Sequence, residues 1–164
     1  MTWNTARKMT QRTVPCVNAR EKAMSLLLYK PRSEAELRER LCGAGFSTEE
    51  AENAVDYVKS FGYVNDRRYA ENYARSMQER ASRRMIRMGL RQKGVEEDLI
   101  VEALEDLDVS EEETLERMIR KKAGVPHHLE EKEMRRLYGF LARKGFSGGA
   151  VSKAVRRYEG LAED

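Results

Sequence analysis

The sequence contains one short pattern three times, at a spacing of about 50 residues. Each copy has two apolar residues four positions apart, then a glycine four positions further on, and then Phe or Val. The three copies run from Leu37 to Phe46, from Ile86 to Val95 and from Leu137 to Phe146. A chain that repeats a unit of this size folds as similar modules in a row, each packed on its neighbour, rather than as one irregular globule.

The pattern predicts two helices in every copy. Apolar residues four positions apart lie on one face of a helix, and the glycine suits the left-handed residue that often ends one. Ser47 with Glu50 has the spacing of a capping box, which opens the next helix. Ser33 with Glu36 has the same spacing and opens the helix before it.

A further helix precedes each pair. The first begins at about Asn18 and ends before Pro31, the second follows Asn65-Asp66, and the third begins at Ser110. No segment shows a sustained strand-like alternation. We therefore predict an all-α fold, a tandem array of three three-helix modules that is elongated and able to curve at its joints.

The expected boundaries follow from this count. Residues 1–17 form a flexible basic N-terminal tail that includes Trp3, and the three modules cover residues 18–64, 65–108 and 109–164. The links at residues 61–64 and 107–109 are short and contain apolar residues, so we expect packed joints there.

Charge is segregated along the chain. Residues 66–94 carry nine basic and three acidic groups, residues 95–116 carry eleven acidic groups and no basic one, and residues 117–164 carry twelve basic and six acidic groups. Solvated helix surfaces account for any one block. Alternation on this scale favours a charged partner, with the acidic block meeting a basic patch or repelling free DNA.

No catalytic motif is present, and neither a phosphate-binding loop nor HExxH nor GxSxG occurs. His127 and His128 are adjacent, so they cannot face one site on a helix, and we interpret them as a solvated loop pair. Cys16 and Cys42 lack metal-site spacing and are expected to be reduced thiols. We expect no enzyme, cofactor or metal, and a soluble cytoplasmic protein without membrane association.

The strongest candidate for binding is the basic helix at residues 82–93. Arg84, Arg87 and Arg91 follow helical spacing and share one face, roughly opposite Ile86 and Leu90. Outward guanidinium groups suit phosphate or carboxylate, and a merely solvated face remains the alternative. Tyr69 and Tyr73 have the spacing of core residues rather than of a stacking platform for bases.

Three motifs in this order resemble the RecX family of bacterial regulators. They are Ser33-x2-Glu36-Leu37-x3-Leu41-x3-Gly45-Phe46, Phe61-Gly62-Tyr63-Val64-Asn65-Asp66-x2-Tyr69-Ala70 and Leu90-Arg91-Gln92-Lys93-Gly94-Val95. The resemblance implies a non-enzymatic array of three-helix modules that lies along the groove of the RecA–single-stranded-DNA filament. It implies reduced filament extension, strand exchange, ATP hydrolysis and stimulated self-cleavage of the SOS repressor.

The expected partner is thus the RecA recombinase filament, with single-stranded DNA as a further contact inside it, and the chain itself is expected to be a monomer. Two alternatives stay open: a helical protein that binds nucleic acid directly without a recombinase, and a helical scaffold for an unrelated protein. The candidate partner-binding residues are Arg67, Arg68, Arg83, Arg84, Arg87, Arg91, Lys93, Arg135, Arg136, Arg143 and Lys144.

Overall fold

The computed structural model describes residues 18–162, and this part of the chain contains nine helices and no strand. The predicted all-α fold is therefore confirmed, while the expected N-terminal tail with Trp3 lies outside the described residues. The helices are α1 (Ala19–Tyr29), α2 (Glu34–Gly43), α3 (Thr48–Ser60), α4 (Asp66–Met77), α5 (Arg83–Gln92), α6 (Glu97–Glu105), α7 (Glu111–Ala123), α8 (Glu131–Arg143) and α9 (Gly148–Gly160).

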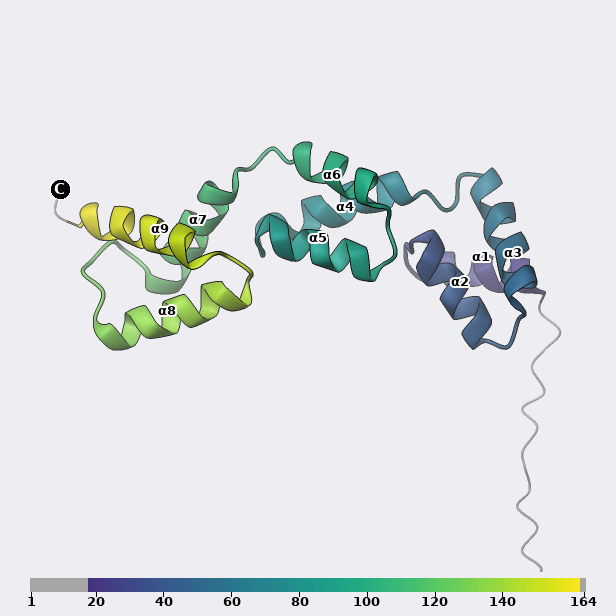
Figure 1. Cartoon of the computed structure of the whole chain (residues 1–164), viewed down its shortest axis with the longest axis horizontal. Coiled ribbons are helices and arrows are strands. Elements are labelled where there is room, and N and C mark those ends of the chain that lie inside the picture. The colour runs from purple at the N-terminus through teal and green to yellow at the C-terminus, as the bar shows by residue number, and fades with distance from the viewer. Residues whose placement is uncertain (1–17, 163–164) are drawn as a thin grey trace, which may run out of the picture.

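The helices form three modules, each with its own hydrophobic core. Extensive helix contacts occur only within α1–α3, within α4–α6 and within α7–α9. Buried apolar side chains accordingly form three separate clusters, one in each module. The modules lie in a row (Figure 1), which confirms the tandem array. The apolar pairs of the repeat are all buried: Leu37 and Leu41, Ile86 and Leu90, and Leu137 and Leu141.

Local signals fix the helix starts. The predicted capping boxes at Ser47 and Ser110 are both present. Ser33 caps α2 by accepting a hydrogen bond from the backbone N–H of Glu36. The Glu36 carboxylate, which the capping-box spacing assigned to the start of α2, accepts a hydrogen bond from Lys93 of the next module. Residue spacing along one helix cannot reveal such a contact between modules.

The middle helices of the modules, α2, α5 and α8, meet end to end (Figure 1). The Ser33 hydroxyl at the start of α2 donates a 2.5 Å hydrogen bond to the carbonyl of Lys93 at the end of α5. The Ser82 backbone N–H at the start of α5 donates a 2.9 Å hydrogen bond to the carbonyl of Lys144 at the end of α8. Each contact joins the negative end of one helix dipole to the positive end of the next.

Glycines allow these close approaches. Gly94 and Gly145 follow α5 and α8 with φ angles of 69° and 89°, in the left-handed region that the repeat predicted. A Cβ atom on Gly94 would overlap the Ala35 side chain at the start of α2, and one on Gly145 would overlap Met85 at the start of α5. Glycine is therefore needed for the turn and for the joint at once.

Polar side chains complete the first joint. The Asp66 carboxylate accepts a 2.9 Å hydrogen bond from the backbone N–H of Glu34, and burial raises the pKa of Asp66. Lys93 Nζ lies 2.6 Å from Glu36 Oε1, and the Tyr69 hydroxyl donates to Glu36 Oε2 at 3.2 Å. Burial alone would raise the pKa of Glu36, but the bonds from Lys93 and Tyr69 outweigh it and lower that pKa.

The second joint is bonded differently. The Thr114 hydroxyl of α7 donates a 2.9 Å hydrogen bond to the Gln78 carbonyl at the end of α4. Arg117 of α7 and Glu79 form an exposed ion pair of 2.7 Å. The helix-end contact is thus repeated between modules, while the side chains around it are particular to each joint.

The first link is packed through only one of its apolar side chains. Phe61 and Tyr63 are 60% and 54% exposed, and only Val64 of this link is buried. Phe61 contacts Tyr57 of α3 and Tyr63 instead, with ring centroids 5.0 and 6.0 Å apart. In the second link Leu107 does pack into the core of its module.

The joint geometry makes a prediction for Gly94. Replacement by Ala costs about 1–2 kcal/mol for the left-handed backbone, and the Cβ additionally pushes against Ala35. Gly45→Ala is the matched control, because Gly45 also has a positive φ, of 100°, but a Cβ there meets nothing within 4 Å. Gly94→Ala should lower the free energy of unfolding more than Gly45→Ala and should change the small-angle X-ray scattering profile. Equal losses and unchanged profiles would contradict the joint.

Candidate partner-binding surface

Helix α5 presents its arginines as the spacing predicts. Ser82 caps the helix by accepting a hydrogen bond from the backbone N–H of Met85. Ile86 and Leu90 are buried in the core of the second module. On the opposite side Arg84 and Arg91 are exposed and Arg87 is half-buried, so a stripe of guanidinium groups faces solvent.

Two of these three arginines share one carboxylate, a feature the sequence analysis did not anticipate. Glu97 at the start of α6 lies 2.7 Å from Arg91 Nε and 3.4 Å from Arg87 Nε. The hydrogen bond from Arg91 lowers the pKa of Glu97. Exposed ion pairs of this kind are weak, and their arginines can exchange one anion for another. Glu97 therefore competes with an anionic partner for Arg87 and Arg91 but does not prevent the partner from binding them.

Three other candidate residues also form ion pairs. Arg67 bonds Glu102 of α6, and Arg135 bonds Glu131 one turn earlier in α8, at 2.6 Å. Lys93 bonds Glu36 and belongs to the first joint rather than to a free surface. Arg68 donates a 3.0 Å hydrogen bond to the Gly62 carbonyl, which ties it to the first link.

The remaining candidate cations have no carboxylate within 4.0 Å among residues 18–162. Arg84, Arg136 and Arg143 are exposed, and Arg83 is half-buried. Lys144 Nζ lies 5.8 Å from the centre of the Phe140 ring. These residues lie on α5 and α8 or directly after α8, so the candidate cations without a nearby carboxylate follow the row of middle helices (Figure 1).

The acidic block at residues 95–116 is partly used inside the modules. Besides Glu97 and Glu102 on α6, Glu112 of α7 bonds Lys153 of α9 at 3.1 Å. Glu116 bonds Arg157 of α9 at 3.1 Å. The opposite blocks of the sequence therefore partly neutralise one another within modules two and three.

One basic groove was missed altogether. It lies where the α4–α5 link meets α7 and α8, with a volume of about 380 Å³. Its cations are Arg80, Lys121, Lys122 and Lys144, of which only Lys144 was a candidate from the sequence. The adjacent lysines at the end of α7 were the available signal, but cations at a helix C-terminus are also expected for the helix dipole alone.

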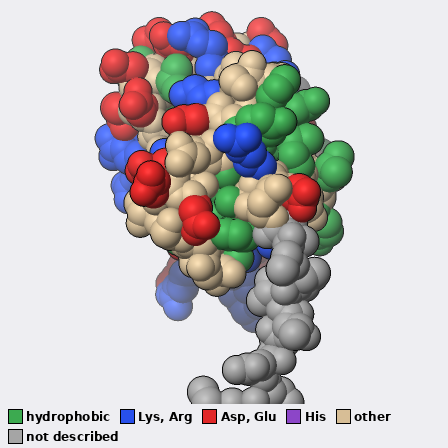
Figure 2. Space-filling model, turned by 90° about the vertical axis from the view of Figure 1, so that its right-hand side faces the viewer, with side chains coloured by type: hydrophobic (Ala, Val, Ile, Leu, Met, Phe, Trp, Pro, Cys, Tyr) green, Lys and Arg blue, Asp and Glu red, His purple; other side chains and the backbone are tan. Residues whose placement is uncertain are grey.

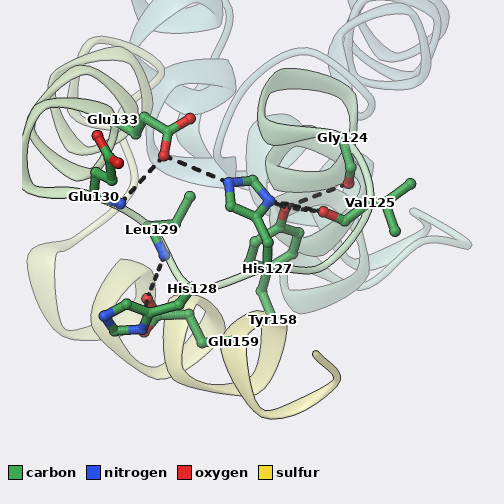
Figure 3. Close-up of polar contacts among 9 residues, drawn as sticks. All are labelled: Gly124, Val125, His127, His128, Leu129, Glu130, Glu133, Tyr158 and Glu159. Atoms are coloured by element: carbon green, nitrogen blue, oxygen red, sulfur yellow. Dashed lines mark hydrogen bonds and ion pairs between the residues drawn. The ribbon is translucent and has the colours of Figure 1, made fainter. Parts of the chain in front are cut away.

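The two histidines have different roles (Figure 3). His127 Nδ1 lies 2.9 Å from the Val125 carbonyl and 3.1 Å from the Tyr158 hydroxyl, and Nε2 lies 3.5 Å from Glu133. Tyr158 also donates to the Val125 carbonyl at 2.8 Å. His127 thus connects the α7–α8 loop to α9, although its side chain remains 42% exposed in that loop. The side chain of His128 is 89% exposed, as expected.

The described part of the chain gives little support for a metal site, a disulfide or a membrane-spanning helix. Residues 18–162 contain no group of three or more His, Cys, Asp or Glu side chains that could hold a metal ion. Cys42 is a free, exposed thiol, and Cys16 lies outside the described residues. None of the helices described is both long enough and apolar enough to cross a membrane.

Comparison with known proteins assigns each module separately. Residues 19–57, 65–104 and 110–155 match the family models described as the first, second and third three-helix domains of RecX. The matches follow the order of the modules along the chain, and each falls within one set of three helices.

Similar curated proteins carry one name. The regulatory protein RecX of Amycolatopsis mediterranei is 33% identical over 142 residues, which cover 84% of this chain and 81% of that protein. That of Streptomyces coelicolor is 35% identical over 147 residues, covering 87% and 78%. That of Clostridium perfringens strain 13 is 30% identical over 130 residues, covering 77% of this chain and 61% of the relative.

Two solved structures share the fold. The crystal structure of RecX from Lactobacillus salivarius matches with a TM-score of 0.69 and 21% identity, over 86% of this chain and 94% of that one. A crystal structure of a regulatory protein RecX matches with a TM-score of 0.68 and 24% identity, over 83% and 70%.

The histidine contacts predict a pH dependence. The bond to the Val125 carbonyl, assisted by Glu133, raises the pKa of His127 above its ordinary value of 6.5. A raised pKa means that the protonated histidine stabilises the fold below that value and that the stabilisation is lost as the pH rises through the folded-state pKa. His127→Gln should therefore speed amide hydrogen exchange in α7–α9 more at about pH 5.5 than at about pH 8.5. An equal effect at both pH values would contradict the assignment.

Proposed function

This chain belongs to the RecX family of regulatory proteins, and on that premise we propose that it binds the RecA–single-stranded-DNA filament and modulates its activities. The modulation is mostly inhibitory and extends to the recombinase, ATPase and coprotease activities of the filament. The protein acts by occupying the filament, not by catalysis of its own. Its relatives named above are regulatory proteins, and no catalytic motif was found in its sequence.

The repeated joint is the observation that carries the proposal. Helix-end contacts at corresponding positions, one from the Ser33 hydroxyl and one from the Ser82 backbone N–H, connect three similar modules, so similar surfaces recur along the molecule. A recombinase filament also repeats its protomers at a fixed step. Once one module has bound the filament, the next module is held close to its own binding site. Contacts that are individually weak then give tight binding together, because the effective concentration of each further module is high.

The charge distribution supports the same proposal. The exposed candidate cations of α5 and α8 follow the row of middle helices (Figure 1), and Glu97 of α6 pairs with two of the α5 arginines. An acidic protein surface or the phosphates of bound DNA would match this row. Arg84 is the central candidate, because it is exposed and no carboxylate lies within 4.0 Å of it in the described part of the chain.

Reversal of charge on α5 tests the proposal. The wild-type protein should inhibit RecA ATPase activity on single-stranded DNA at substoichiometric amounts, because one bound chain restrains several protomers. Arg84→Glu/Arg87→Glu/Arg91→Glu should lose this inhibition, with circular dichroism used to verify the helical fold. Full inhibition by the folded triple variant would exclude the site, and no inhibition by the wild type would exclude the function.

Glu97 supplies a second, opposite test. Glu97→Gln removes the carboxylate that pairs with Arg87 and Arg91, so the stripe becomes available to the partner. We expect half-maximal ATPase inhibition at a lower concentration of this variant than of wild type, by about 1.4- to fivefold, which corresponds to the ~0.2–1 kcal/mol of an exposed pair. Glu105→Gln on the same helix is the control for the change of charge and should have no such effect. Weaker inhibition by Glu97→Gln would contradict the proposed role of the stripe.

Direct binding to nucleic acid without a recombinase remains the second candidate function, and the basic groove between modules two and three favours it. Regulation of a recombinase and direct binding to DNA predict different responses of ATP hydrolysis to added DNA. A recombinase regulator lowers ATP hydrolysis by the filament at constant DNA, whereas a plain DNA-binding protein does so only by competing for the DNA, and excess DNA then restores hydrolysis. The ATPase assay at two DNA concentrations therefore separates them.

A further inference from the structure

The first module carries most of the large apolar side chains that stay exposed. Five of the eight in the described part of the chain lie in residues 18–64: Leu28, Tyr29, Tyr57, Phe61 and Tyr63. Figure 2 looks onto the end of the molecule that α1–α3 form, and hydrophobic side chains gather on one side of it. The terminal unit of a repeat array normally has a polar outer face, because no further unit covers it. An apolar end therefore indicates that another segment packs on it.

Three of these side chains form one aromatic surface. The ring centroids of Tyr57 and Phe61 are 5.0 Å apart, and those of Phe61 and Tyr63 are 6.0 Å apart. The three residues are nevertheless between 38% and 60% exposed, so much of their area faces solvent. Aromatic area of this kind favours a further aromatic or apolar side chain.

The chain enters the fold beside this aromatic surface. Asn18 caps α1, and the guanidinium group of Arg20 in the first turn lies 4.5 Å from the centre of the Tyr57 ring. Residues 1–17 are therefore attached only a few residues from the rings. An extended chain spans about 3.3 Å per residue, so this segment is long enough to cross the aromatic surface. Its attachment also gives it a high effective concentration there.

The charge of the segment matches that of α3. Residues 1–17 contain three basic residues and no acidic one: Arg7, Lys8 and Arg12. The exposed side of α3 carries three carboxylates with no cationic side chain within 4.0 Å among residues 18–162: Glu49, Glu52 and Asp56. A basic segment is thus attracted to the helix that ends at the aromatic surface.

We propose that residues 1–17 bind the aromatic surface of their own chain. Trp3 packs on Phe61 and Tyr63, because tryptophan offers the largest aromatic face in the segment. The basic side chains lie near the carboxylates of α3, as Arg20 already lies over Tyr57. The segment then covers the apolar end of the array, and a partner of the aromatic surface must displace it.

Trp3 is the only tryptophan of the chain, so tryptophan fluorescence of the full-length protein reports directly on this segment. A synthetic peptide of residues 1–17 gives the signal of a solvated Trp3. In the protein, we expect emission at a shorter wavelength than in the peptide. We also expect acrylamide quenching to be about threefold weaker, because a segment held at millimolar effective concentration is bound most of the time even by a weak site.

Two double variants test the location. Phe61→Ser/Tyr63→Ser should raise the acrylamide quenching of Trp3 to that of the peptide. Leu28→Ser/Tyr29→Ser is the matched control, because these residues are exposed too but lie at the opposite end of α1 from Arg20. It should quench like the wild type. Circular dichroism and thermal unfolding should be similar for both variants, since all four side chains are exposed.

Equal quenching of the wild-type protein and the peptide would overturn the proposal, and so would protection of Trp3 that is lost only in the Leu28→Ser/Tyr29→Ser variant. Protection that increases with protein concentration, together with a dimer in light scattering, would assign the surface to the segment of a second copy and overturn binding within one chain. Salt should weaken the protection by screening exposed charges. Protection independent of salt would overturn the contribution of the α3 carboxylates.

The experiment contains neither recombinase nor nucleic acid. Its outcome is therefore independent of the proposed regulation of RecA.

Discussion

The architecture depends on one contact, the meeting of a helix C-terminus with the N-terminus of the middle helix one module earlier. The unpaired carbonyls at the end of α5 and α8 find donors at the start of α2 and α5, so groups that helices normally leave to water are satisfied between modules. The contact is short, which leaves no room for a Cβ atom on Gly94 or Gly145. Each joint therefore has a defined geometry, and the spacing of the modules follows from it.

The charge pattern takes on a different meaning once the modules are assembled. In the sequence, the acidic block at residues 95–116 indicated attraction to a charged partner. In the structure, three of its carboxylates form ion pairs with cations of their own module: Glu97, Glu102 and Glu112. Among the candidate residues from the sequence, the cations without a nearby carboxylate lie on α5 and α8 or directly after α8, and the groove beside Phe140 is lined by cations of two modules. Binding capacity thus depends on which cations lack a local partner, and net charge along the sequence cannot show this.

Most of the fold could be predicted because its signals are local. Capping residues such as Ser47, helix-ending glycines and apolar pairs act within a few residues of one another, and all of these were found in the structure. The joints could not be predicted in the same way, because Lys93 and Glu36 meet through the packing of modules. The exposure of Phe61 and Tyr63 could not be predicted for a related reason: an apolar residue of a link is buried only if other residues cover it.

The same reasoning explains why the candidate surface was only partly predictable. The stripe on α5 follows from helical spacing, but the Arg91–Glu97 pair depends on how α6 turns back after Gly94. The basic groove combines residues from an interhelical link, α7 and α8, and exists only because the second joint holds these segments together. The joint between modules two and three also brings the groove cations together, so a ligand that bound there more tightly at one angle between these modules would favour that angle. In a protein that follows a helical filament, that angle decides whether the third module reaches its next contact.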